Sequence, residues 1–129
     1  MNRKGFAAIR ITAVVTIISA FLFSCESYVF DPPELDPDAE ISFATDLAPV
    51  FASKCSGCHG GGINPDLRTG NAYASLVTDA TPATKYVNTA SPETSLVYTK
   101  LSTGSHATIA TDIEKQMILK WIQDGAMNN

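Results

Sequence analysis

Cys55-Ser56-Gly57-Cys58-His59 is the stretch of this sequence that decides the fold. It has the C-x-x-C-H pattern of covalent haem attachment. Two thiols at this spacing can bond to the two vinyl groups on one edge of a porphyrin, and the imidazole of the next residue then binds the iron. The motif therefore predicts one c-type haem, held covalently by Cys55 and Cys58, with His59 as the proximal iron ligand.

Two other chemistries use the same residue types. A thioredoxin-type redox pair would follow a strand in a βαβ setting, which this sequence does not offer. A zinc site would need four ligands, for which Cys55, Cys58, His59 and His106 are the only candidates once Cys25 is assigned to lipid. Adjacent Cys58 and His59 would chelate one metal poorly. Haem is the preferred interpretation, and zinc and disulfide chemistry remain as alternatives.

Residues 1–24 predict an export signal. Arg3, Lys4 and Arg10 form a basic start, and an apolar run of thirteen residues, 11–23, follows them. A helix that spans a bilayer needs about 20 apolar residues, so the run is better interpreted as the core of a signal peptide. Export agrees with the motif, because the haem of c-type cytochromes is attached outside the cytoplasm.

Leu22-Phe23-Ser24-Cys25 resembles the bacterial lipobox, which directs cleavage before a cysteine and lipid attachment to it. We therefore predict acylation of Cys25, which would anchor the chain at a membrane that faces the periplasm or the cell surface. Ordinary signal cleavage that leaves a free Cys25 is the alternative. Residues 25–40 are acidic and rich in proline, which predicts a flexible tether between the anchor and a folded domain.

The charge of the exported part limits its partners. After residue 24 the chain has six Lys and Arg against thirteen Asp and Glu. Such an acidic chain disfavours nucleic acid and anionic lipid surfaces as partners, because phosphate contacts need Lys and Arg. The sequence instead predicts redox protein partners with basic docking surfaces.

Residues 41–129 predict an all-α domain. Thr45 is expected to be the N-cap of a first helix that contains Phe51 and leads to Cys55, with Pro49 tolerated early in it. A short helix is expected over Asn71–Val77. There is no alternating strand pattern and no phosphate-binding glycine motif.

Two later helices have clearer starts. Ser91 before Pro92 predicts an N-cap, and apolar residues at helical spacing follow it: Leu96, Val97 and Leu101. Thr111 and Glu114 match the capping box and predict a last helix that ends at Gly125. Its apolar face contains Ile113, Met117, Ile118, Trp121 and Ile122.

Residues 41–129 resemble the mono-haem, class I-like cytochrome c domains of bacterial envelope lipoproteins. The resemblance rests on the C-x-x-C-H motif, on Ser91-Pro92-Glu93-x-Ser95-Leu96-Val97-Tyr98 and on the ending Trp121-Ile122-x-x-Gly125-Ala126. It implies a small helical domain wrapped around one haem. It also implies that the first and last helices cross over the haem edge, where Phe51 and Trp121 would meet.

The distal iron ligand is where this sequence departs from the family. The family usually supplies a Met, often followed by Pro, just before the final helix, and no Met-Pro occurs here. His106 occupies the corresponding loop, so we expect it to be the second iron ligand. Met117, Met127 and an open position are the alternatives. Met117 lies on the apolar stripe of the last helix, which favours a role in the core.

Three classes of function are compatible with these residues. The leading one is a single-electron carrier that is tethered to a membrane surface and has no catalytic residues. The second is a haem enzyme or small-ligand-binding protein with an open sixth iron position. The third is a structural lipoprotein subunit of a larger redox assembly. Two histidines in the whole chain leave little for acid-base catalysis.

Overall fold

A computed structural model describes residues 33–78 and 86–129, which belong to one compact unit. In these ranges the chain is helical and forms no strand, which confirms the all-α prediction for them. No helix in the same ranges is long and apolar enough to cross a membrane. The predicted signal peptide, Cys25 and the first part of the predicted tether lie outside the described residues.

The first helical segment begins earlier than predicted. A π-helical turn, η1 (Phe43–Leu47), leads directly into α2 (Ala48–Lys54). Ser42 is the N-cap, because its Oγ accepts a hydrogen bond from Thr45 N while its own N–H donates to Asp46 Oδ2 at 2.8 Å. The prediction of Thr45 as the N-cap is wrong: Ser42 is the last extended residue, and Thr45 is already inside the helical segment.

The start of the third helix also differs from the prediction. A single 3-10 turn, η4 (Pro92–Thr94), precedes α3 (Leu96–Ser102). Ser91 makes no side-chain capping bond, and the extended backbone at Ser95 separates the two helical segments. Ser95 is fully buried, and its Oγ accepts a hydrogen bond from Asn88 N at 2.9 Å. The apolar residues predicted for this helix do lie in α3.

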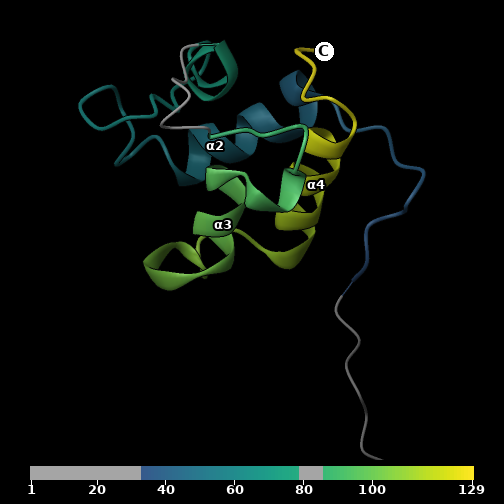
Figure 1. Cartoon of the computed structure of the whole chain (residues 1–129). Helices are drawn as coiled ribbons and strands as arrows, with labels where there is room; N and C mark the ends of the chain where they lie inside the picture. Colours follow the sequence, from purple (N-terminus) through teal and green to yellow (C-terminus); the bar gives the residue numbers. More distant parts are fainter. Residues whose placement is uncertain (1–32, 79–85) are drawn as a thin grey trace, which may run out of the picture. The chain divides into compact units, whose positions relative to one another are not determined.

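The last helix, α4 (Asp112–Gln123), follows its sequence signals closely. Thr111 Oγ1 accepts a hydrogen bond from Glu114 N, and the Glu114 carboxylate accepts one from Thr111 N, which confirms the capping box. Gly125 follows the helix with φ +100°, a conformation that suits glycine at a helix end. In Figure 1, α4 lies beside α3, which it contacts.

The predicted helix over 71–77 is present and is centred slightly later. A π-helical turn, η2 (Ala74–Thr78), contains the buried Leu76, while Tyr73 and Val77 pack at the edge of the core. Tyr73 also donates a hydrogen bond from its hydroxyl to Ala126 O at 3.0 Å. This contact joins the segment to the end of the chain.

An aromatic cluster joins the two ends of the domain. Phe51 and Trp121 are each 1% exposed, and both pack near Phe43, with ring centroids 6.1 and 5.2 Å from it. Tyr73 meets Phe43 edge-on at 5.2 Å. Phe43, which the sequence analysis did not single out, therefore connects the two aromatic residues that the resemblance brings together.

The segments on either side of the helical domain pack against it. Asn129 accepts hydrogen bonds at η1 from Phe43 N through its Oδ1 and from Ala44 N through its carbonyl, both at 2.9 Å. At the other end, Leu35 N donates to Gln116 Oε1 at 2.8 Å, and Leu35 and Ala39 contact the core. The last residues of the segment expected to be a tether thus contact the domain.

Candidate haem site

The C-x-x-C-H motif forms a tight turn at the end of α2. Cys55 is the C-cap of α2, and its carbonyl accepts hydrogen bonds from Cys58 N at 3.2 Å and His59 N at 2.9 Å. Cys55 is half-buried and Cys58 is exposed, and neither is in a disulfide. The turn places both thiols and the His59 ring at the wall of one cavity.

The cavity has a volume of about 320 Å³ and a mostly apolar lining. This size lies within the range of small-molecule and cofactor pockets. Segments between residues 51 and 109 contribute apolar side chains to it, among them Phe51, Leu67, Leu76, Val97, Leu101 and Ile109. An apolar wall excludes water from a flat aromatic ligand, so the cavity fits a porphyrin in its chemical character.

A backbone carbonyl fixes the protonation of the His59 ring. His59 Nδ1 lies 3.1 Å from the carbonyl oxygen of Pro65. Because a carbonyl can only accept, Nδ1 carries the proton and Nε2 keeps its free electron pair for a metal. Leu67 N donates to His59 O at 2.8 Å and ties the same loop to the motif. Pro65 was not among the residues predicted from the sequence, because its contact with His59 depends on how the loop folds.

The structure brings His106 to the same cavity. It ends a 3-10 turn, η5 (Gly104–His106), and is half-buried. The centroids of the His59 and His106 rings are 6.4 Å apart, and their planes make an angle of 47°. Ser105 Oγ lies 3.4 Å from His106 Nδ1. This contact does not involve Nε2, the other nitrogen of the ring.

The two alternative methionine ligands lie elsewhere. Neither Met117 nor Met127 lines the cavity. Met117 packs against the hydrophobic core, as its position on the apolar stripe predicts, and Met127 is 61% exposed. All four residues predicted to hold the cofactor line the cavity: Cys55, Cys58, His59 and His106.

The alternatives to haem find less support around the motif. Burial raises the pKa of the Cys55 thiol, and the nearby Glu114 carboxylate adds to this effect. Redox-active C-x-x-C pairs have the opposite property, a lowered thiol pKa. For zinc, the described part of the chain contains no group of three or more His, Cys, Asp and Glu side chains that could hold a metal ion.

The loop after the motif is held by one carboxylate. Both carboxylate oxygens of Asp66 pair with the Arg68 guanidinium, and the shortest distance, from Arg68 Nη2 to Asp66 Oδ2, is 2.7 Å. Asp66 Oδ2 also accepts a hydrogen bond from Asn71 Nδ2 at 2.8 Å. These contacts hold the pKa of Asp66 well below its usual range. Gly61, at φ +94°, lies beneath the Arg68 guanidinium, where a Cβ would come within 2.7 Å of Nη2. The network stiffens the segment that presents Pro65 to His59.

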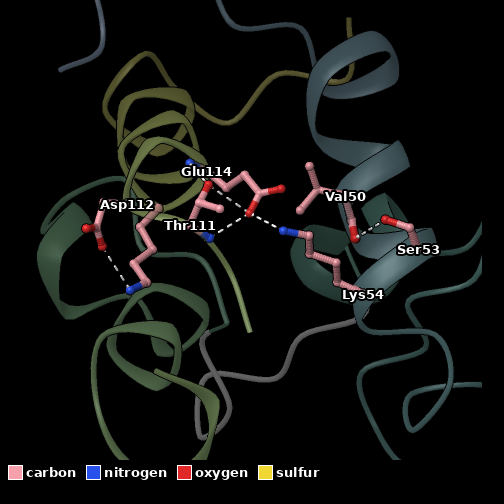
Figure 2. Close-up of polar contacts among 7 residues, drawn as sticks. Val50, Ser53, Lys54, Thr111, Asp112 and Glu114 are labelled. Atoms are coloured by element: carbon pink, nitrogen blue, oxygen red, sulfur yellow. Dashed lines mark hydrogen bonds and ion pairs between the residues drawn. The ribbon is translucent and has the colours of Figure 1, made fainter. Parts of the chain in front are cut away.

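An ion pair joins the motif to the last helix. Figure 2 shows Lys54, at the end of α2, pointing to Glu114 in the first turn of α4; Nζ and Oε2 are 2.6 Å apart. The same oxygen accepts hydrogen bonds from Thr111 N and Thr111 Oγ1. Burial raises the pKa of Glu114, but the hydrogen bonds from Lys54 and Thr111 outweigh it and leave this pKa below its ordinary value.

We expect Glu114→Gln to destabilise the domain by about 1 kcal/mol at pH 7, the usual value of a helix cap. Because the folded-state pKa of Glu114 is lowered, its stabilisation is present above the unfolded pKa of about 4.3 and is lost as the pH falls through the folded value. The measurement is urea unfolding at pH 7 and pH 3, with the exposed Glu93→Gln as control. A destabilisation that stays the same at both pH values would contradict this assignment.

Comparison with known proteins adds no further constraint: no protein-family model, no curated protein sequence and no solved structure matches the chain.

Proposed function

We propose that this protein is a single-electron carrier with one c-type haem, bonded to Cys55 and Cys58 and ligated by His59 and His106. The observation that carries the proposal is that all four side chains line one apolar cavity, although the sequence separates His106 from the motif by 46 residues. Cys55, Cys58 and His59 are neighbours in the chain, so their common location was expected. The presence of His106 at the same cavity was not guaranteed.

The distance between the two histidine rings supports ligation of one metal from opposite sides. With metal–nitrogen bonds of about 2.0 Å and ring centroids about 1.1 Å beyond the nitrogens, two opposite imidazoles have centroids about 6.2 Å apart. Two imidazoles on one tetrahedral metal would have centroids about 5.1 Å apart. The observed 6.4 Å agrees with the first arrangement, which is the one that haem iron requires.

The chain's own groups prepare the site for this role. The Pro65 carbonyl orients His59 so that Nε2 is the free nitrogen, and the apolar wall keeps water away from the bound group. The haem iron, when bound, supplies one-electron chemistry by changing between its ferrous and ferric states. If His59 and His106 both ligated the iron, no position would remain open for a substrate, which favours electron transfer over the enzymatic alternative.

This function predicts that the visible spectrum of the purified haem protein changes reversibly, by one electron, in a redox titration in which the potential is measured. It also predicts that carbon monoxide leaves the spectrum of the reduced protein unchanged, since no axial position is open. Both are measured in one optical cell. Full carbon monoxide binding by the wild type would overturn electron transfer in favour of a ligand-binding or enzymatic haem.

We further propose that the carrier is exported and held at a membrane facing the periplasm or cell surface by lipid on Cys25, with basic redox proteins as partners. The support is the basic and apolar N-terminus, the lipobox-like Leu22-Phe23-Ser24-Cys25 and the acidic charge after residue 24.

Labelled palmitate is expected to enter the wild type and to be absent from Cys25→Ala, because the acyl chains need that thiol and the amine created by cleavage before it. The measurement is autoradiography of the two proteins after export in bacterial cells. Cys58→Ala is the control and retains the label. Equal labelling of wild type and Cys25→Ala would remove the lipid anchor.

A further inference from the structure

Two lysines, Lys54 and Lys100, lie at the mouth of the cavity. Lys100 is an exposed residue, and it also lines the cavity. A side chain with both properties lies where the cavity opens to solvent. Its neighbours on the same face of α3, Leu96, Val97 and Leu101, line the cavity with apolar groups. Lys100 is therefore the single charged residue on the cavity-facing side of α3.

The charges around the cavity are all of one sign. Apart from cysteine and histidine, its ionisable lining residues are Lys54, Lys100 and Tyr86, and no Asp or Glu of the described chain lines it. This contrasts with a sequence in which acidic residues outnumber basic ones. A mostly apolar cavity with a cationic rim fits a ligand that is apolar over most of its surface and anionic at one edge.

The two lysines are not equivalent. Lys54 is already neutralised by Glu114 at 2.6 Å, and it directly precedes Cys55, so it belongs to the edge where the thiols lie. The ammonium group of Lys100 makes no hydrogen bond or ion pair with any described residue. A lysine can lay its aliphatic stem along an apolar wall and keep its ammonium group at the surface, where it can pair with an anion.

We propose that Lys100 binds a carboxylate of the cavity's ligand, which on the function proposed above is a haem propionate. A haem carries its two propionates on the edge away from the vinyl groups. Bonds from Cys55 and Cys58 to the vinyl carbons fix one edge at the motif, which leaves the carboxylates for a different part of the rim. Lys100 belongs to α3 and not to the motif, and it is the unpaired cation among the described residues that line the cavity.

The test is a zero-length cross-link on the mature haem protein. A water-soluble carbodiimide joins an amine to a carboxylate in contact with it, forming an amide with loss of one water. We expect mass spectrometry to find the peptide that contains Lys100 joined to the haem on the Cys55–Cys58 peptide. Lys100→Gln should lack this product and Lys120→Gln should retain it, because Lys120 pairs with Asp124 at 3.0 Å and does not line the cavity.

The outcomes separate this proposal from the one on which it rests. A haem-bearing peptide with no link to Lys100, or with a link to Lys54 instead, overturns the role of Lys100 and leaves the haem site intact. A motif peptide that carries no haem overturns both. As a second readout, Lys100→Gln should lower the reduction potential more than Lys120→Gln does, because it removes a positive charge nearer the iron. Equal shifts would also count against the contact.

Discussion

Replacing both Cys55 and Cys58 with Ala is expected to abolish the haem signal that remains with the chain after denaturing electrophoresis. On the proposed function, the apolar cavity and the two histidines would still bind haem in the folded double variant, but only thioether bonds survive denaturation. Each single variant keeps one possible thioether and should retain a strongly reduced signal. The measurement is haem-dependent peroxidase staining of the gel, compared with total protein.

Cys25→Ala is the matched control for this experiment, since it removes a cysteine outside the motif and should keep the full signal. The double variant also separates attachment from binding. Before denaturation it should still give a haem spectrum if His59 and His106 hold the iron. A haem signal in the denatured double variant equal to that of the wild type would contradict covalent attachment at the motif.

His106→Ala is expected to convert a protein that does not bind carbon monoxide into one that binds it fully. The variant removes the ring whose centroid lies 6.4 Å from that of His59 in the same cavity, and on the proposed ligation it would leave one iron position open. His106→Met should instead raise the reduction potential by on the order of 100 mV, because a thioether favours ferrous iron more than an imidazole does. Optical titration with carbon monoxide and redox potentiometry measure the two effects.

Met117→Leu is the control for ligand identity. Met117 packs against the core and does not line the cavity, so its replacement by a residue of similar volume should leave the potential and the carbon monoxide response unchanged. A sulfur-to-iron band in the near-infrared spectrum of the oxidised wild type would show methionine ligation. That result would contradict the assignment of His106.

The helix boundaries that were predicted correctly from the sequence depend on local contacts. The capping box of Thr111 and Glu114 involves groups three residues apart, so it forms as soon as the helix does. The N-cap predicted at Thr45 is wrong, and Ser91 precedes η4 without a side-chain capping bond. Ser42 is chosen where the chain end reaches η1, through Ser42 Oγ donating to Asn129 O at 2.9 Å. Ser95, which precedes α3, makes no side-chain capping bond either; its buried Oγ accepts a hydrogen bond from Asn88 N. Neither tertiary contact can be read from local sequence.

The site divides in the same way. Cys55, Cys58 and His59 were identified because the chemistry of attachment requires them to be neighbours in sequence. His106 could be proposed because the chain has one other histidine, but its position opposite His59 depends on how α3 and η5 pack. The Lys54–Glu114 ion pair joins residues 60 positions apart, and Lys100 becomes a candidate only once α3 is seen to line the cavity.

The central claim is that a haem is bonded to Cys55 and Cys58. Its most direct test is the intact mass of the denatured chain, exported from bacterial cells that mature a known cytochrome c in parallel. The account predicts that the wild-type mass exceeds the polypeptide mass by one haem and that fragmentation assigns the addition to the peptide containing Cys55, Cys58 and His59. A wild-type chain without this added mass, from cells in which the reference cytochrome is fully matured, would contradict it.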